Sequence, residues 1–150
     1  MNRIVADSKH YDLCGQVIGA AMKVHSTFGP GFLESVYQNA LMWELQKPGL
    51  TVDLQKPITV HYGGQVVGVL TADLVVNDSL IVELKANQLL AKDEVQLVNY
   101  LVATGINEGL LLNFGAERLE YKKKFRLPKK ELASFRSART ILLILFILSK

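Results

Sequence analysis

Three charged side chains of this sequence lie in strand-like runs that are otherwise strongly apolar. Asp73, Glu83 and Lys85 lie within residues 71–100, TADLVVNDSLIVELKANQLLAKDEVQLVNY, among runs of leucine, valine and isoleucine. A carboxylate buried among such residues is costly unless a cation neutralises it or it binds a metal. The trio therefore indicates either a structural ion cluster or a site for a hard divalent cation, which prefers oxygen ligands.

The sequence between the two acids predicts a β-hairpin that brings them together. Residues 77–79, Asn-Asp-Ser, are turn formers between two β-branched runs. With a three-residue loop, Asp73 faces Glu83 across the ladder, and the two-residue period of a strand places Lys85 on the same face. A two-residue loop would instead pair Asp73 with Val82 and send the carboxylates to opposite faces. On these residues alone the structural ion cluster is the favoured interpretation, and the metal site is the alternative.

Two predicted helices carry further polar residues that could reach this hairpin. In the helix expected at 88–104, Gln96 and Tyr100 lie on one line at i, i+4 spacing beside the apolar stripe. Such a line usually marks only a helix boundary, but the preceding hairpin could direct it at the acids. The helix expected at 31–47 carries Glu34 in its first turn, where spacing alone indicates an ordinary acid favoured by the helix dipole.

The remaining periodicities complete an α/β fold in one domain. A helix is expected at 8–26, and strands at 50–62 or 57–62, 65–76, 80–86, 109–114 and 117–125. The first three strands form a β-meander, and the helix after them makes a β-α-β crossover, so the strands at 80–86 and 109–114 should be parallel. We expect a mixed sheet flanked by helices, with the second, third and fourth strands central and the fifth at an edge.

Charge is compatible with nucleic acid without demonstrating that it binds. The chain has 17 Lys and Arg against 14 Asp and Glu, a net charge of +3. Much of the positive charge lies in KKKFRLPKK at 122–130. A run of this kind is usually a solvated surface and occasionally a phosphate-binding arm. The candidate nucleic-acid contacts in it are Lys122, Lys123, Lys124 and Arg126.

The two ends of the chain and its single cysteine bear on where it acts. Cys14 allows no internal disulfide and lies on an apolar helix face, which predicts a buried thiol and fits a reducing cytoplasm. The first residues contain no apolar signal segment.

Residues 1–131 are expected to form the domain and 132–150 a helical segment ending in ILLILFIL. Eight apolar residues cannot span a bilayer, which needs about 20, so we expect this segment to dock on the core or to join copies into a homo-oligomer.

Five motifs in order resemble one family. They are GPGFLESVY (29–37), ADLVVND (72–78), IVELKA (81–86), QLVNYL (96–101) and GLLLNFG (109–115). Together they resemble the GxxExxY proteins, small single-domain members of the PD-(D/E)XK nuclease superfamily, over about residues 10–125. The signature itself reads Gly31, Glu34, Tyr37. The resemblance implies a restriction-endonuclease-like core and favours the metal site over the ion cluster.

The resemblance also implies a chemistry. Asp73, Glu83 and the backbone carbonyl of Leu84 would coordinate Mg²⁺ or Mn²⁺. The catalytic set that it implies is Glu34, Asp73, Glu83, Lys85, Gln96 and Tyr100. The reaction would be hydrolysis of phosphodiester bonds in DNA, which is favoured over RNA. The alternative is a non-catalytic module that keeps the fold and binds nucleic acid or a protein.

Overall fold

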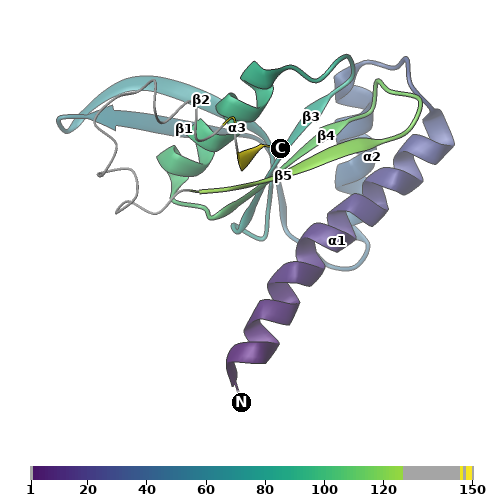
Figure 1. Cartoon of the computed structure of the whole chain (residues 1–150), viewed down its shortest axis with the longest axis horizontal. Helices are drawn as coiled ribbons and strands as arrows, with labels where there is room; N and C mark the ends of the chain where they lie inside the picture. Colours follow the sequence, from purple (N-terminus) through teal and green to yellow (C-terminus); the bar gives the residue numbers. More distant parts are fainter. Residues whose placement is uncertain (1, 127–145, 147, 150) are drawn as a thin grey trace.

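The computed structural model describes residues 2–126, 146, 148 and 149, with side chains from Leu13 onwards. Its elements, labelled in Figure 1, are α1 (Asn2–Phe28), α2 (Glu34–Gln46), β1 (Val52–Tyr62), β2 (Gln65–Val76), β3 (Leu80–Lys85), α3 (Ala91–Thr104), β4 (Glu108–Asn113) and β5 (Glu120–Phe125). The strands form one sheet in the order β1-β2-β3-β4-β5.

The sheet topology confirms the predicted α/β fold class. β1, β2 and β3 are antiparallel neighbours, as a β-meander requires. β3 and β4 are parallel and are joined through α3, which is the expected crossover. β4 and β5 are antiparallel, so β2, β3 and β4 are central and β5 lies at an edge of this sheet.

Two apolar layers cover the sheet. α1 and α2 pack on one face, where Val82 and Leu84 of β3 join their core. α3 packs on the other face, where Ile81 of β3 and Leu111 of β4 meet Leu97. Because side chains alternate along a strand, burial on both faces requires the almost continuous apolar runs that β3 and β4 have.

The loop between β2 and β3 has the predicted length. Val76 pairs with Leu80, which leaves the three residues between them as the loop. Asn77 and Asp78 adopt positive φ angles of 51° and 52°, a conformation that Asn and Asp tolerate better than other non-glycine residues. The Ser79 N–H donates to the Val76 carbonyl at 3.0 Å. Leu74 pairs with Val82, and continuing this register by one residue sets Asp73 against Glu83, as expected.

Several element boundaries differ from the expected ones. β1 begins at Val52, between the two predicted starts, and β5 begins at Glu120 rather than 117. α3 begins at Ala91 rather than 88, because the Asp93 carboxylate accepts the Leu90 N–H at 2.9 Å and caps the helix there. Residues 86–90 therefore form a loop between β3 and α3.

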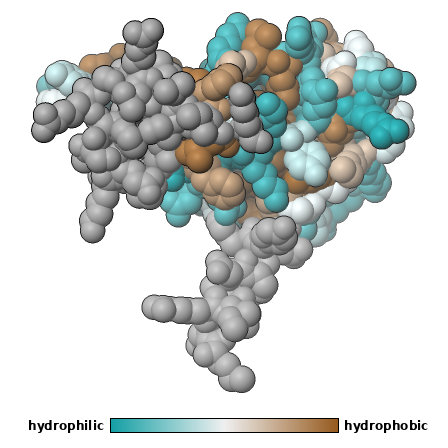
Figure 2. Space-filling model, viewed as in Figure 1, coloured by the Kyte–Doolittle hydropathy of each residue, from teal (hydrophilic) through white to brown (hydrophobic). Residues whose placement is uncertain are grey.

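The predicted thiol environment is confirmed, whereas the C-terminal segment lies outside the described residues. Cys14 is buried, and burial raises the pKa of its thiol. Apart from 146, 148 and 149, the expected segment 132–150 is not described. None of the helices in the described part of the chain combines the length and the apolar character needed to cross a membrane. On the face seen in Figure 2, hydrophobic side chains are interspersed with hydrophilic ones.

Candidate active site

A tyrosine fixes the loop between α1 and α2. The Tyr37 hydroxyl donates to the Gly29 carbonyl at 2.6 Å and accepts the Phe32 N–H at 3.1 Å. The Tyr37 ring is buried and stacks on Phe114 with ring centroids 4.6 Å apart. Gly31 has a φ of 113°, which a residue with a side chain rarely adopts. Gly31 and Tyr37 thus determine the path of the loop and the position at which α2 begins.

This loop positions Glu34, the first residue of α2, near Asp73 and Glu83 of the hairpin. Glu34 is half-buried. Burial raises the pKa of its carboxyl, and the negative charge of Asp73 raises it further, while Lys85 acts in the opposite direction. Glu34 therefore lies in the electrostatic field of Asp73 and Lys85, although it comes from a different part of the chain.

Asp73 and Glu83 each bond to the backbone of the other's strand. The Asp73 N–H donates to Glu83 Oε1 at 3.0 Å, and the Leu84 N–H donates to Asp73 Oδ2 at 2.9 Å. The amide of Gln55 donates to Asp73 Oδ1 at 3.3 Å and to Gln38 Oε1 at 3.0 Å. The two carboxylates are therefore held in a fixed arrangement by both strands and by α2.

The ladder between β1 and β2 is irregular at this point. Leu54 pairs with Leu74 and Lys56 pairs with Ala72. Between them Gln55 has a positive φ of 49°, which is uncommon for a residue other than glycine. The Asp73 N–H is directed to Glu83, as described above. This local distortion turns the amide of Gln55 toward the acids, and nothing in the sequence pattern predicted it.

Burial and the charge of Asp73 disfavour the ionised form of Glu83. Glu83 is only 7% exposed. Burial, followed by the negative charge of Asp73, raises the pKa of Glu83 to about 9, although the hydrogen bond from the Asp73 backbone acts to lower it. At neutral pH Glu83 therefore keeps its proton unless a cation joins the pair, because desolvation and a neighbouring anion both disfavour the ionised form.

The donor set fits one kind of metal site. Asp73 and Glu83 offer hard carboxylate oxygens, and Mg²⁺ is commonly bound by one or two carboxylates while it keeps several water molecules. Within residues 2–126 and the three later described residues, no group of three or more His, Cys, Asp or Glu side chains could hold a metal ion. The pair thus suits an open site completed by water and substrate rather than a closed protein cage.

Lys85 is held by an acid that the sequence analysis did not select. Its Nζ lies 3.4 Å from Oδ1 of Asp93, which is only 6% exposed. Burial acts to lower the pKa of Lys85, but the charges of Asp93, Glu34 and Glu83 outweigh it and raise the pKa. The only sequence signal for Asp93 was its place in the N-terminal half of the expected helix, which many surface acids share.

α3 brings the two polar residues of its line to the acid pair. Gln96 Nε2 donates to the Tyr100 hydroxyl at 2.6 Å. Tyr100 is buried, and burial, followed by the negative charge of Glu83, raises the pKa of its hydroxyl. The structure therefore brings Tyr100 close to Glu83 and links Gln96 to it, which the spacing allowed but which a polar line of this kind does not usually indicate.

The basic residues of β5 have partners within the protein. Lys122 and Lys124 place their Nζ atoms 3.0 and 3.2 Å from Oε1 of Glu94 on α3. Lys124 is 6% exposed, so the interpretation of this run as solvated surface is wrong at that position. Arg126 donates from Nη2 and Nε to Oδ1 of Asn107 at 2.9 and 3.2 Å. Contact of these residues with nucleic acid stays a prediction.

Comparison with known proteins identifies one family model that matches most of the chain. The model of the PD-(D/E)XK nuclease superfamily matches residues 11–125. No curated protein matches the chain. A solved structure described as the crystal structure of SSO0001 is similar at 16% identity and a TM-score of 0.48, covering 74% of this chain and 57% of that one. An alkaline exonuclease, LHK-Exo from Laribacter hongkongensis, is similar at 11% identity and a TM-score of 0.41, covering 85% and 84%.

Proposed function

Since the chain belongs to the PD-(D/E)XK nuclease superfamily, we propose that it is a metal-dependent nuclease that hydrolyses phosphodiester bonds in DNA. The observation that carries the proposal is the pair of half-buried Asp73 and buried Glu83 next to Lys85. The geometry of Gly31, Glu34 and Tyr37 supports placing the chain among the GxxExxY members, because it gives each signature residue a separate task.

Asp73 and Glu83 would hold Mg²⁺ or Mn²⁺, with the Leu84 carbonyl as a further ligand. A bound divalent cation supplies polarisation of the scissile phosphate and a lower pKa for a nearby water molecule. For this to occur Glu83 must release its proton, which its raised pKa opposes and a cation favours. Binding of the cation and ionisation of Glu83 are therefore linked.

The other site residues act on the substrate and the water. The Lys85 ammonium would stabilise negative charge that develops on the phosphate oxygens, and its raised pKa keeps it charged. Glu34, whose pKa is raised beside Asp73, would orient the attacking water or accept its proton. Gln96 would bind a phosphate oxygen or a water, and Tyr100 would pack against the site and hold the Gln96 amide in place.

Cleavage assays on labelled single-stranded, duplex and branched DNA, each with Mg²⁺, Mn²⁺ or EDTA, test the proposal. Asp73→Asn should abolish cleavage, and Lys85→Ala should reduce its rate on the order of 10²–10³-fold, as for loss of one transition-state donor. Lys47→Ala, which changes an exposed lysine paired with Glu44, is the control and should cleave like the wild type. A labelled RNA of the same sequence tests the preference for DNA.

Absence of cleavage would contradict the nuclease proposal. If the wild type cleaves none of these DNA forms with either cation, the nuclease proposal is wrong. The Lys85–Asp93 ion pair would then be a structural contact, and a non-catalytic module that binds nucleic acid or protein would be the better description.

A further inference from the structure

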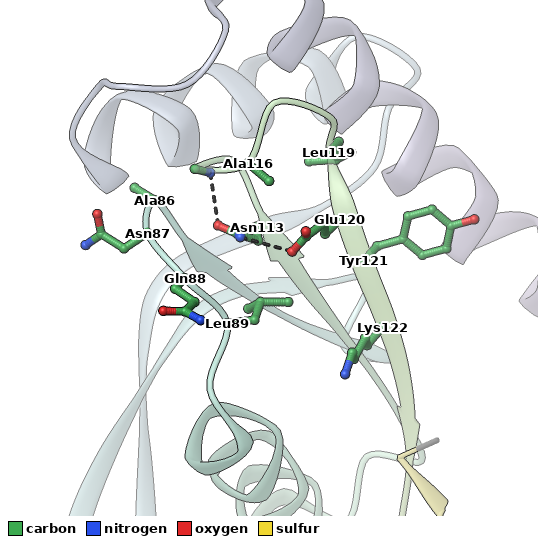
Figure 3. A pocket seen from close by; sticks show the side chains of 11 residues that line it. Ala86, Asn87, Gln88, Leu89, Asn113, Ala116, Leu119, Glu120, Tyr121 and Lys122 are labelled. Carbon is green, nitrogen blue, oxygen red and sulfur yellow. Dashed lines mark hydrogen bonds between the residues drawn. The ribbon is translucent and has the colours of Figure 1, made fainter.

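A cavity of about 850 Å³ opens beyond the carboxyl ends of β3 and β4 (Figure 3). The loop at 86–89 lines one side, and residues 119–122 of β5 and its approach line the other, with Asn113 between them. Its volume is within the range of about 300–1,000 Å³ that is usual for ligand sites. Neither acid of the candidate active site lines it, and none of its residues has a role in the proposed cleavage.

The cavity adjoins the candidate active site through the strand register. Lys85 pairs with Asn113 on the neighbouring parallel strand, and the Phe114 N–H donates to the Lys85 carbonyl at 2.8 Å. Adjacent strands are separated by about 4.8 Å. Residues 81 and 111 both face α3, so the strand period places Lys85 and Asn113 on that face as well. If a phosphate of a nucleic-acid strand lies at Lys85, the neighbouring nucleotide of that strand therefore lies at this cavity.

The walls of the cavity are fixed by the backbone. A side chain at Gly115 would place its Cβ against the Ala86 carbonyl oxygen, so the turn after β4 and the loop after β3 are in direct contact. The Asn113 amide is held at both ends, because its Oδ1 accepts the Gly115 N–H at 2.9 Å and its Nδ2 donates to Glu120 at 3.2 Å. The cavity is thus a formed site rather than a gap between mobile side chains.

The charges of the lining groups disfavour a phosphate as occupant. Among the described residues that line the cavity, Lys122 and Glu120 are charged, one of each sign. Lys122 already lies 3.0 Å from Glu94, so its charge is balanced within the protein. The lining therefore offers no unbalanced positive charge that would attract a phosphate, and a neutral polar group can bind without electrostatic repulsion.

The uncharged polar groups of the cavity suit the edge of a nucleobase. Asn87 and Gln88 are exposed on the loop and each offers an amide with donors and an acceptor (Figure 3). The side-chain amide of a single Asn or Gln can form two hydrogen bonds with the edge of one base. The Tyr121 ring points away from the other lining side chains, so hydrogen bonding rather than stacking is the recognition on offer. The Watson–Crick edge of a base is free to bond to such amides only when the base is unpaired, so an unpaired nucleotide is the preferred ligand.

We infer that this cavity binds the base and sugar of one unpaired nucleotide adjoining the scissile phosphate, through the amides of Asn87 and Gln88. The inference rests on the proposed function and extends it to a substrate preference. Single-stranded or frayed DNA, whose bases are free, should be bound in preference to continuous duplex.

The test is binding of a fluorescein-labelled DNA pentanucleotide in EDTA, followed by anisotropy, so that no cleavage occurs. The wild type should bind the single strand more tightly than a labelled duplex. The double variant Asn87→Ala/Gln88→Ala should lose about tenfold in affinity for the single strand, as expected for two hydrogen bonds. Against a pentanucleotide that has sugars and phosphates but no bases, the variant and the wild type should bind equally, because the amides have lost their partner.

The matched control is Asn39→Ala/Asn99→Ala, which removes two exposed amides outside the cavity and should keep wild-type affinity. An unchanged affinity of the Asn87/Gln88 variant for the normal strand, or an equal loss on normal and base-free strands, overturns the cavity assignment. In that case Asp73-dependent cleavage is unaffected and the nuclease proposal stands. A wild type that neither binds the strand nor cleaves DNA overturns both.

Discussion

Replacing Glu83 with glutamine should make the metal-free protein more stable at neutral and alkaline pH. Glutamine has the shape of the protonated acid and can still accept the Asp73 N–H that Glu83 Oε1 accepts at 3.0 Å. Burial and Asp73 raise the pKa of Glu83 from 4.5 to about 9 in the folded protein. The folded state therefore binds a proton over a pH range in which the unfolded state has released it. Stability from this group is complete below pH 4.5 and is lost as the pH rises towards 9.

The size of the stability difference between Glu83→Gln and the wild type follows from the pH range between the ordinary and the raised pKa of Glu83. Each pH unit above the ordinary pKa costs the wild type about 1.4 kcal/mol, so at pH 7 the deficit is about 3 kcal/mol, while Glu83→Gln has none. For a chain of this length 1 kcal/mol corresponds to about 2–4 °C in melting temperature. The variant should therefore melt roughly 6–12 °C higher than the wild type at pH 7 and at nearly the same temperature below pH 5.

The assay is urea unfolding of both proteins in EDTA at intervals between pH 5 and pH 9. Glu44→Gln is the control: its two lysine partners lower the pKa of this half-buried carboxyl, so it stays ionised across the range and its difference from the wild type should be flat. A difference between Glu83→Gln and the wild type that does not grow with pH would show that Glu83 is ionised in the metal-free fold, and would refute the argument from burial and Asp73.

Addition of a divalent cation and two further substitutions test other parts of the site. Mg²⁺ or Mn²⁺ should raise the melting temperature of the wild type by mass action and leave that of Asp73→Asn unchanged; a wild type insensitive to millimolar divalent ions contradicts the site. Asp93→Asn should lower the pKa of Lys85, so the alkaline fall in cleavage rate should move to lower pH than in the wild type; an unmoved pH profile would deny Asp93 a positioning role. Gly115→Ala should destabilise by about 1–3 kcal/mol in urea unfolding, because its Cβ meets backbone, whereas Gly68→Ala has open space and should cost less.

The hairpin could be predicted from the sequence because local rules determine it. A loop of turn-forming residues between two apolar runs permits few registers, and only the odd loop sets Asp73 against Glu83. The crossover and the parallel pairing of β3 with β4 followed from connectivity alone. These features depend on residues close together in the sequence or on rules that hold for nearly all sheets.

The partners of charged side chains could not be predicted in the same way. Lys124 belongs to a basic run that has the composition of a solvated surface, yet it is buried against Glu94, which lies 30 residues earlier in the sequence. Asp93 resembled any acid in the N-terminal half of a helix, and its contact with Lys85 depends on where α3 starts. Gln55 enters the site through a backbone distortion in β1. Each of these contacts is set by tertiary packing, which periodicity does not encode.

The order of the strands also bears on aggregation. β1 and β5 are the outer strands of the described sheet, and each has a row of backbone groups that β2 or β4 does not use. Such a row can recruit a strand from another molecule. β5 carries the exposed Lys122 and Lys123, and β1 carries Lys56 followed by Pro57, which has no N–H to offer. Charge and proline thus disfavour edge-to-edge growth on both sides, so any assembly of this protein is expected to use the helical faces rather than an extended sheet.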